Sequence, residues 1–427
     1  MRDTNGNGGV EKREAAAASE ASIRYRGWRV VGVCFVMATL IWGFGFYGHG
    51  FYLAELHRRH GWPASLIGSA TTLYYILSAV LVVFISDAMR ILSVRACVIA
   101  GTLALAGAVA ALPFIDHPWQ LVAAYMVMSL AWATMSLGAI NTILGLWFEQ
   151  KRGLAISLAL NGASFGGIVI VPALVFLAGA TSFTTAALTG AVLILVLMLP
   201  LATSVLGAAI PRNETPQGSH SPREAAAPDR AWTRASALRT LAFWNVCGTF
   251  ALAITSQAGF LVHQIAFLEP AIGRYTAGVA VAVTSSMAIV GRLLLGALSG
   301  WINQRIASAV SLASQAAALA VMTQTNDPVT LLVACAVYGF SVGNVITFPS
   351  LIVQSEFPAG SFAMLIGLST GIGQFTYAFG PGLLGIVRDA TGGYGAALGL
   401  CVALNLAAAS IILRRPRGAS GLAQRGE

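Results

Sequence analysis

The sequence predicts an all-α integral membrane protein with twelve transmembrane helices, arranged as two pseudo-symmetric six-helix halves. Of its 427 residues, 57% are hydrophobic and 10% are charged, whereas ordinary globular chains carry about 25% charged residues. Apolar runs of roughly 20 residues, long enough to cross a bilayer, recur along the chain. These runs do not alternate in polarity, which argues against a membrane β-barrel. An internal repeat completes the case for two halves.

The repeat relates two stretches that lie 209 residues apart. Phe148, Gly162 and Pro172 in the first stretch correspond to Phe357, Gly371 and Pro381 in the second. A weaker match lies near the start of each half, where His49 and His263 are each followed six residues later by a glutamate, Glu55 or Glu269. Repeats of apolar segments at half the chain length are typical of transporter folds.

The apolar runs divide into twelve candidate spans with short turns between them. The spans cover approximately residues 28–56, 63–86, 93–115, 118–147, 152–179, 181–207, 239–268, 274–299, 303–323, 328–354, 361–387 and 393–413. Residues 208–238 are rich in Pro, Ser and charge, which predicts a linker between the halves 28–207 and 239–413. Residues 1–27 and 414–427 are expected to be polar tails, and no cleavable signal peptide is visible in the first of them.

The basic residues predict how the chain is oriented in the membrane. With both termini in the cytoplasm, twenty of the 25 Lys and Arg residues fall on the cytoplasmic side, and four fall outside: Arg58, Arg59, Arg274 and Arg388. This is the bias expected of a multi-pass protein of the cell (inner) membrane. It also accounts for the net charge of +9 without a nucleic-acid partner.

Cysteine usage and motif content argue against an enzyme. The five cysteines all lie in apolar segments, with no CxxC and no His/Cys cluster, so we interpret them as small hydrophobic residues rather than disulfides or metal ligands. A nucleotide loop, an HExxH motif and a clustered acid pair are also missing. We therefore expect no cofactor, no metal and no catalytic residues.

The twelve spans, the charged linker and the repeat resemble the major facilitator superfamily. Within it, residues 147–164 carry an aromatic pair, the basic pair Lys151-Arg152 and later Gly162-x-Ser164. This stretch is similar to the fifth-span signature of the monocarboxylate transporter branch, which includes oxalate–formate antiporter-like proteins. Gly291-Arg292, followed by Gly296, is similar to the eighth-span pattern of that branch, and Gly27-Trp28 matches the first-span signature only in part.

The resemblance also implies roles for particular residues. Asp87 stands where the superfamily's loop motif between spans two and three has its acid, although the rest of that motif is degenerate. The motif's usual role as a cytoplasmic latch between helices is carried over to Asp87 alone. In the branch, the eighth-span arginine contacts the substrate carboxylate, which would be the role of Arg292. The resemblance further implies that the protein is a monomer.

The spans contain few polar residues that could form a substrate site. Arg292 is the sharpest candidate, because an ionised group inside a span normally faces a cavity or a partner, and a guanidinium binds carboxylates well; the alternative is that it reaches the membrane interface. Polar or aromatic groups expected to line a central cavity are Tyr47, Tyr74, Asn141, Asn344, Gln374 and Tyr377. The oxalate-handling member of the branch has a lysine in the eleventh span, and none occurs between Phe362 and Val387, so one carboxylate fits better than two.

Coupling and substrate remain open on the sequence alone. No Asp or Glu lies deep in a span, which leaves His49 and His263 as candidates for proton coupling; antiport or uniport fits the sequence equally well. The first hypothesis is a secondary carrier of small organic anions, in particular monocarboxylates, that works by alternating access. The alternative in the same fold is export of amphipathic drugs or metabolites. A membrane-embedded enzyme or sensor is the third, and disfavoured, hypothesis.

Overall fold

The computed structural model describes residues 20 and 22 and the ranges 25–206, 232–298, 300–357 and 361–414. Most of the expected linker and of the two tails lies outside the described residues. Eleven helical stretches within the described ranges are long and apolar enough to cross a membrane. The remaining expected span, 361–387, is the eleventh along the chain and is built from two consecutive helices that meet at Phe379. The chain therefore has the fold of twelve membrane helices in two halves.

The first half begins with α2 (Arg26–Trp42), the π-helical segment η1 (Gly43–Tyr47) and α3 (Gly48–His60), which together form one span. The next four spans are built from α4 (Ala64–Val83) with α5 (Ile85–Leu92), α6 (Val94–Ala111) with η2 (Leu112–Phe114), α7 (Pro118–Met135) with α8 (Leu137–Gly145), and α9 (Arg152–Phe165) with the π-helical segment η3 (Gly166–Ile170) and α10 (Val171–Ala180). The half ends with α11 (Phe183–Ser204).

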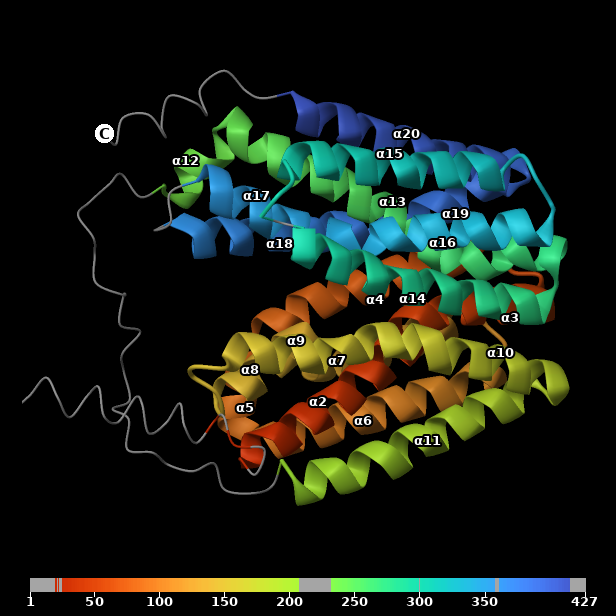
Figure 1. The fold of residues 1–427 in the computed structure, drawn as a ribbon. Helices are drawn as coiled ribbons and strands as arrows, with labels where there is room; N and C mark the ends of the chain where they lie inside the picture. The colour runs from red at the N-terminus through yellow and green to blue at the C-terminus, as the bar shows by residue number, and fades with distance from the viewer. Residues whose placement is uncertain are drawn as a thin grey trace, which may run out of the picture.

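The second half follows a short helix, α12 (Arg234–Leu238). Its spans are α13 (Leu241–Ile272), α14 (Arg274–Leu298), α15 (Gln304–Met322), α16 (Pro328–Val345) with α17 (Phe348–Glu356), α18 (Phe362–Ala378) with α19 (Gly380–Thr391), and α20 (Tyr394–Leu413). Figure 1 shows most of the first half as the lower bundle and most of the second half as the upper bundle.

Helix breaks follow local chemistry. Pro381 lies in the first turn of α19. Proline has no backbone N–H, so it would break the hydrogen-bond ladder inside a continuous helix, whereas the first turn of a helix needs no such donor. Ser93, Ser182 and Asn303 accept backbone N–H bonds at the starts of α6, α11 and α15, which satisfies donors that a helix start leaves unpaired. The split of the eleventh span at Phe379 is thus a consequence of the Gly-Pro sequence that follows it.

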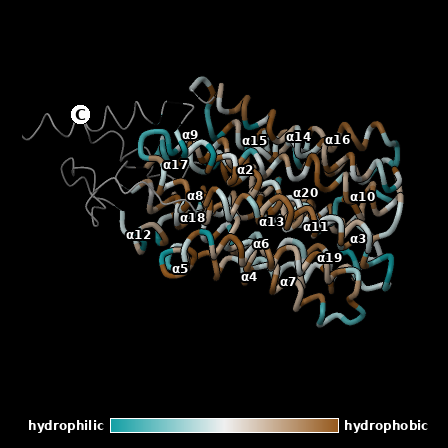
Figure 2. The backbone as a smooth tube through the Cα atoms, turned by 90° about the horizontal axis from the view of Figure 1, so that it is seen from below, coloured by the Kyte–Doolittle hydropathy of each residue, from teal (hydrophilic) through white to brown (hydrophobic). Residues whose placement is uncertain are grey.

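The surface of the bundle is suited to a bilayer. Figure 2 shows apolar residues along the length of the helices and polar residues gathered toward the two ends of the bundle. Large apolar side chains on the outside are exposed, among them Phe176 and Val196, each more than 60% exposed. Such a surface is costly in water and favourable in lipid, where the helices satisfy their own backbone groups.

The two halves meet closely at one end, which we call the closed end. There α4 packs on α19, α3 on α13 and α10 on α14. A Cβ on Gly68 would lie 2.4 Å from the carbonyl oxygen of Pro381, and one on Gly385 would lie 2.5 Å from that of Ala64. The two backbones are therefore in direct contact, which only residues without a side chain permit.

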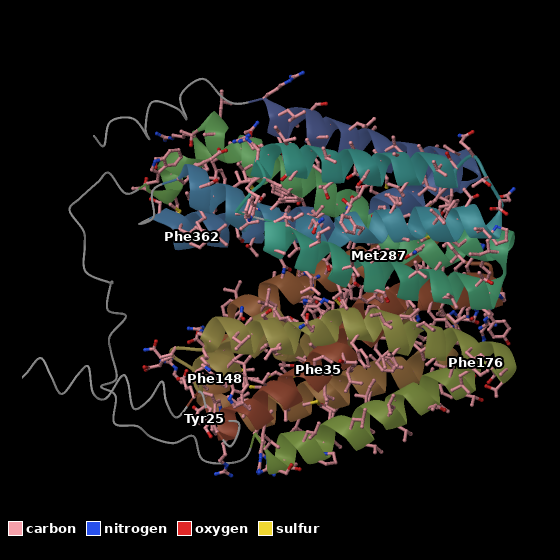
Figure 3. All side chains as sticks on the ribbon, in the orientation of Figure 1. Tyr25, Phe35, Phe148, Phe176, Met287 and Phe362 are labelled. Carbon is pink, nitrogen blue, oxygen red and sulfur yellow. The ribbon has the colours of Figure 1, made fainter. Side chains whose placement is uncertain are left out.

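The opposite end, which we call the divergent end, shows no close packing between the two halves among the described residues. The helices that pack closely against α5, α8 and α17 all belong to the same half as the helix they contact. In Figure 1 the ribbons of the two halves separate toward this end. Figure 3 places Tyr25 and Phe148 at the divergent end of the first half and Phe362 at the same end of the second half.

Matched glycines show how the halves repeat each other. A Cβ on Gly166 would lie 2.5 Å from the carbonyl oxygen of Thr39, on the first span. A Cβ on Gly380 would lie 2.3 Å from that of Thr255, on the seventh span. Both are contacts of the fifth span of a half with its first span, and the two glycines lie 214 residues apart.

The 209-residue register of the sequence holds at the turn before the fifth span of each half. Phe148 packs edge-on against Tyr25, and Phe357 packs in the same way against Trp232. Within the helices that follow, the expected match of Gly162 with Gly371 does not hold. Gly162 faces the carbonyl oxygen of Phe35, whereas a side chain on Gly371 would meet open space.

Candidate substrate site between the two halves

Arg292 lies on α14, eighteen residues after the start of the helix at Arg274 and toward the divergent end. Its side chain is half-buried, and none of the ion pairs among the described residues includes it. The titratable side chain that acts on it electrostatically is that of Tyr47, from the other half. A half-buried guanidinium with no carboxylate beside it favours the approach of an anion.

Tyr47 is placed by two π-helical segments that pack on each other. It is the last residue of η1. A Cβ on Gly167, in η3, would lie 3.0 Å from the Tyr47 ring and 2.2 Å from Ser285 Oγ. Ser285 precedes Arg292 by seven residues on α14, which is two turns and therefore the same helix face. The bare backbone at Gly167 thus brings Tyr47 of the first half onto the Arg292 face of the second. Such π-helical insertions are frequent at functional sites.

An aromatic wall continues across the boundary between the halves. The rings of Tyr75 and Tyr377 lie 4.6 Å apart between centroids, and those of Phe46 and Tyr377 lie 6.4 Å apart. Trp132 packs 6.3 Å from both Phe46 and Tyr75. Four rings from α4, α7, η1 and α18 therefore form one surface, in which only Tyr377 comes from the second half. Phe46 and Trp132 could not be predicted as site residues from the sequence, because a lone apolar aromatic residue in a span gives no signal of a substrate site.

The other expected cavity residues lie in different places. The Tyr74 hydroxyl donates a hydrogen bond of 2.8 Å to the Gly45 carbonyl oxygen, so its polar group is engaged inside the first half. Gln374 is half-buried on α18, one turn before Tyr377. Asn141 and Asn344 each have a buried side-chain oxygen with no hydrogen-bond partner among the described residues. Among the described residues, no hydrogen bond or ion pair joins either of them to Arg292.

The two histidines have unlike surroundings although their sequence contexts match. His49 is fully buried within the first half, between rings of α3, α4 and α7. His263 is also buried, and its Nδ1 and Nε2 lie 3.1 Å from the Tyr394 hydroxyl and 3.0 Å from the Pro381 carbonyl oxygen. His49 follows Gly43 by six residues, whereas His263 follows the equivalent Gly259 by four. Two extra residues turn a helix position by about half a turn, so the two histidines face different neighbours.

The expected motif residues lie at the divergent end. Asp87 is exposed and pairs with Arg90 on its own helix, at 3.3 Å. Phe148 is buried. Arg152 donates a long hydrogen bond of 3.4 Å to the backbone oxygen of Asn141. The Lys151 N–H donates to the carboxylate of Glu20.

The turn at residues 149–151 binds a carboxylate from the N-terminal part of the chain. The backbone N–H groups of Glu149, Gln150 and Lys151 donate to the Glu20 carboxylate at 2.9, 3.1 and 2.9 Å. The Trp28 indole donates to the Glu20 carbonyl oxygen at 3.1 Å. Consecutive N–H groups before a helix form a site suited to an anion. Glu20 therefore fixes the turn between spans four and five, a role that no sequence pattern indicated.

Ion pairs join the two halves at the closed end. Arg58 pairs with Glu55 at 2.9 Å in its own half and with Glu269 in the other half. Arg274 of the second half pairs in turn with Glu55. The matched spacing of Glu55 and Glu269 after the two histidines was visible in the sequence, but it did not show that one arginine would join them.

Asp389 adds a second link at the closed end. Its carboxylate, on α19, accepts the backbone N–H of Ser65 at 2.6 Å and that of Ala64 at 3.3 Å. These two N–H groups belong to the first turn of α4, which leaves its donors free for an acid. The second half thus caps a helix of the first half.

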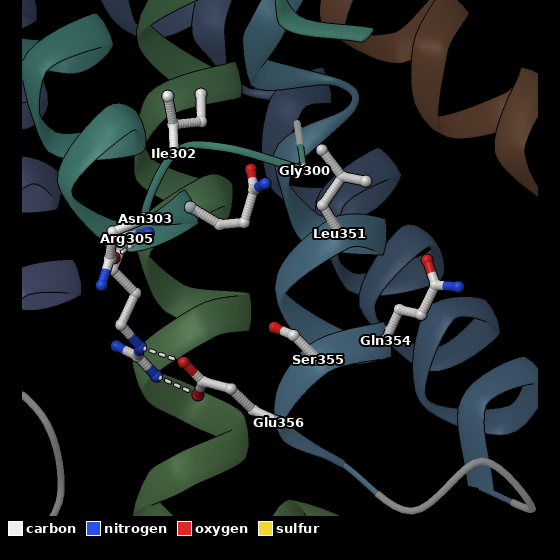
Figure 4. Close-up of a pocket in the computed structure, with 9 residues that line it drawn as sticks. Gly300, Ile302, Asn303, Arg305, Leu351, Gln354, Ser355 and Glu356 are labelled. Carbon is white, nitrogen blue, oxygen red and sulfur yellow. Dashed lines mark hydrogen bonds and ion pairs between the residues drawn. The ribbon is translucent and has the colours of Figure 1, made fainter. Parts of the chain in front are cut away.

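A cavity of about 520 Å³ lies within the second half at the divergent end. Figure 4 shows Arg305 and Glu356 in its lining, paired directly with each other. The Arg305 guanidinium donates to both oxygens of Glu356, at 2.6 and 2.7 Å, and also to the Ile412 carbonyl oxygen at 2.7 Å. Because Glu356 already neutralises the Arg305 guanidinium, we interpret this pair as a structural contact rather than as an anion-binding site.

Comparisons with known proteins agree with this architecture. Residues 35–381 match the family model described as Major Facilitator Superfamily. Among solved structures, the chain is similar to a bacterial homolog of the human lysosomal transporter Spinster, in an inward-facing and occupied conformation. The TM-score is 0.72 at 15% sequence identity, and the match covers 92% of this chain and 97% of that one. At this identity the likeness shows the fold alone. No curated protein matches the chain.

Proposed function

The chain belongs to the major facilitator superfamily, and on this premise we propose that it is a secondary transporter of small organic anions, in particular monocarboxylates. It binds a small-molecule substrate and works in a membrane as a multi-pass protein. The cell (inner) membrane, cytoplasmic termini and a monomeric state are parts of the proposal.

Arg292 carries this proposal. It is half-buried, it lies on the face of α14 that contacts the first half through Ser285, and none of the described ion pairs neutralises it. Its fork of N–H donors matches a single carboxylate. Tyr47 stands beside it and offers a hydroxyl to the same substrate. The Gly-Arg pattern of the monocarboxylate transporter branch supports the same role.

The arrangement of the halves supports alternating access. They are joined at the closed end and separate toward the divergent end, so a substrate would reach Arg292 from the latter. We place the divergent end in the cytoplasm, because the turn at Lys151-Arg152 lies there and basic residues favour that side. The similar Spinster homologue is described as inward-facing, which is consistent with this orientation.

Export of amphipathic compounds is the second candidate. The wall formed by Phe46, Tyr75, Trp132 and Tyr377 offers a broad apolar surface that a small carboxylate does not need. Such a surface suits a ligand with an aromatic or aliphatic body.

Uptake into liposomes separates the two candidates. Reconstituted protein is tested with radiolabelled lactate, pyruvate, acetate and oxalate and with a neutral amphipathic dye. We expect saturable uptake of a monocarboxylate that Arg292→Ala reduces at least about tenfold and that Arg292→Lys restores only in part. Arg90→Ala is the matched control, because Arg90 is an exposed arginine on α5. Transport of the dye alone, or full carboxylate uptake by Arg292→Ala, would contradict the anion proposal.

A further inference from the structure

The interior of the first half contains a cluster of polar atoms whose hydrogen bonds are incomplete. Both ring nitrogens of His49 and the hydroxyl groups of Tyr52, Tyr75 and Tyr125 are buried and have no hydrogen-bond partner among the described residues. We call these four residues the His49 cluster. Buried polar groups in native proteins are nearly always hydrogen-bonded to protein or to ordered water. Five such atoms on four side chains that pack together therefore indicate that something polar binds among them.

The cluster is compact. The His49 ring lies 4.8 Å from the Tyr125 ring, 5.7 Å from that of Tyr75 and 6.1 Å from that of Tyr52. The His49 side chain approaches the backbone carbonyls of Gly45 and Phe46, but without normal hydrogen-bond geometry. The carbonyl oxygens of Gly45 and Phe46 are thus acceptors beside the imidazole, and a bound water could complete the bonds to its nitrogens.

The titratable groups that face His49 are all tyrosines. Tyr52 comes from its own helix, Tyr74 and Tyr75 from α4, and Tyr125 from α7. The Tyr74 hydroxyl is already bonded to the Gly45 carbonyl. The nearest acid along the helix is Glu55, which is engaged by Arg58 and Arg274. His49 is therefore the one residue of the cluster whose side-chain type ordinarily exchanges a proton near neutral pH.

His263, in the second half, is a buried histidine whose hydrogen bonds are complete. Both of its nitrogens have partners, the Tyr394 hydroxyl and the Pro381 carbonyl. The two histidines are similarly buried and similarly spaced from a glutamate, yet only His49 lacks partners. His263 is thus the matched control for His49.

We propose that the His49 cluster is a hydrated site that binds the coupling proton of the transporter. An imidazole nitrogen takes a proton from a hydronium ion, which leaves as water, and the tyrosine hydroxyls, the carbonyls of the π-helical segment and bound water accept hydrogen bonds from the imidazolium N–H groups. The proton leaves to water by the reverse step, so no other reactant is needed.

The position of Tyr75 connects this site to the movement of the halves. Tyr75 belongs to the cluster, and its ring also packs on Tyr377 of the second half at 4.6 Å. In the present conformation the cluster atoms are shielded from solvent. Rocking of the halves separates Tyr75 from Tyr377 and admits water to His49. Binding of the proton is thereby tied to one of the two transport conformations.

The coupling role rests on the proposed transport of carboxylates, so two measurements are combined. The first compares pyruvate accumulation driven by a pH gradient with pyruvate counterflow, which needs no gradient. We expect His49→Gln to reduce the accumulation driven by the gradient at least about tenfold, while its counterflow stays within about twofold of the wild-type rate. His263→Gln should retain both activities. Accumulation that is independent of the gradient in the wild type, or driven accumulation that His49→Gln retains, would overturn the proposal.

The second measurement requires no substrate. Nuclear magnetic resonance of histidine-labelled full-length protein in nanodiscs follows its six imidazoles from about pH 5 to 8. The signal missing from His49→Gln should titrate, and Tyr125→Phe should shift its midpoint. A signal that does not titrate, or a midpoint that Tyr125→Phe leaves unchanged, contradicts the site. The titration still tests the proton site if the wild-type protein carries no carboxylate, or if His49→Gln also loses counterflow.

Discussion

Arg58, in the first half, forms an ion pair with Glu269, in the second half, and thereby closes one end of the molecule. The same guanidinium also bonds to Glu55. The contact joins two acids that stand at matched positions of the repeat. If the halves are to exchange between two conformations, this link must break and form again in each cycle.

Glu269→Gln is expected to weaken the closed conformation modestly. Because the Arg58 side chain is 42% exposed, the pair contributes about 0.5–1 kcal/mol, and the ratio of closed to open molecules should fall roughly two- to fivefold. Spin labels at Trp119→Cys and Val329→Cys, two exposed positions at this end, report the separation of the halves. Glu55→Gln should have the larger effect, since Glu55 is only 8% exposed and has two arginine partners. Equal effects of the two variants would contradict this assignment.

Asp389→Asn tests the cap that one half provides for a helix of the other. The charged cap of α4 is worth about 1 kcal/mol, so the same spin-label distance should lengthen in a larger fraction of molecules. Asp327→Asn is the control, because Asp327 caps α16 within its own half. It should lower the melting temperature without changing the distance. A shift of the distance in both variants would show that the effect is general destabilisation.

Gly68→Ala should prevent the closed end from forming. A Cβ at this position lies 2.4 Å from a backbone oxygen that cannot move aside easily, so one conformation of the cycle is lost. We expect liposome uptake to fall at least about tenfold while the protein still folds, since each half keeps its own packing. Gly371→Ala, which introduces a methyl group into open space, is the control. Normal uptake by Gly68→Ala would show that this backbone contact does not form during transport.

Glu20→Gln tests the contact between the N-terminal segment and the turn at residues 149–151. Three charge-assisted hydrogen bonds become weaker neutral ones, which should cost about 1–2 kcal/mol of stability and lower the melting temperature in detergent. Glu149→Gln removes an exposed charge from the same turn while keeping the backbone donor, and it should be neutral. An unchanged melting temperature in Glu20→Gln would mean that the contact is not stabilising.

The spans were predictable because apolar length is a property of the chain itself. Arg292 could be singled out for the same reason: a charge in an apolar run is visible without knowing its neighbours. The approach of Tyr75 to Tyr377 could not be predicted from the sequence. Helical periodicity indicates which face of a helix is buried, but not which other helix that face contacts. The π-helical segments η1 and η3 were also missed, because the extra residue is accommodated by packing between Gly43 and Ile170, which lie far apart in the chain.

The link between η1 and η3 has a consequence for how the protein is made. Gly43 packs on Ile170, and Gly166 packs on the backbone at Thr39 and Gly43. More than a hundred residues separate the two segments. At about 5–20 residues per second, the ribosome synthesises the fifth span roughly 6 to 25 s after the first. During that interval the first span is in the bilayer without the neighbour that shapes its middle, so its final form is set late, when the fifth span leaves the translocation machinery and docks against it.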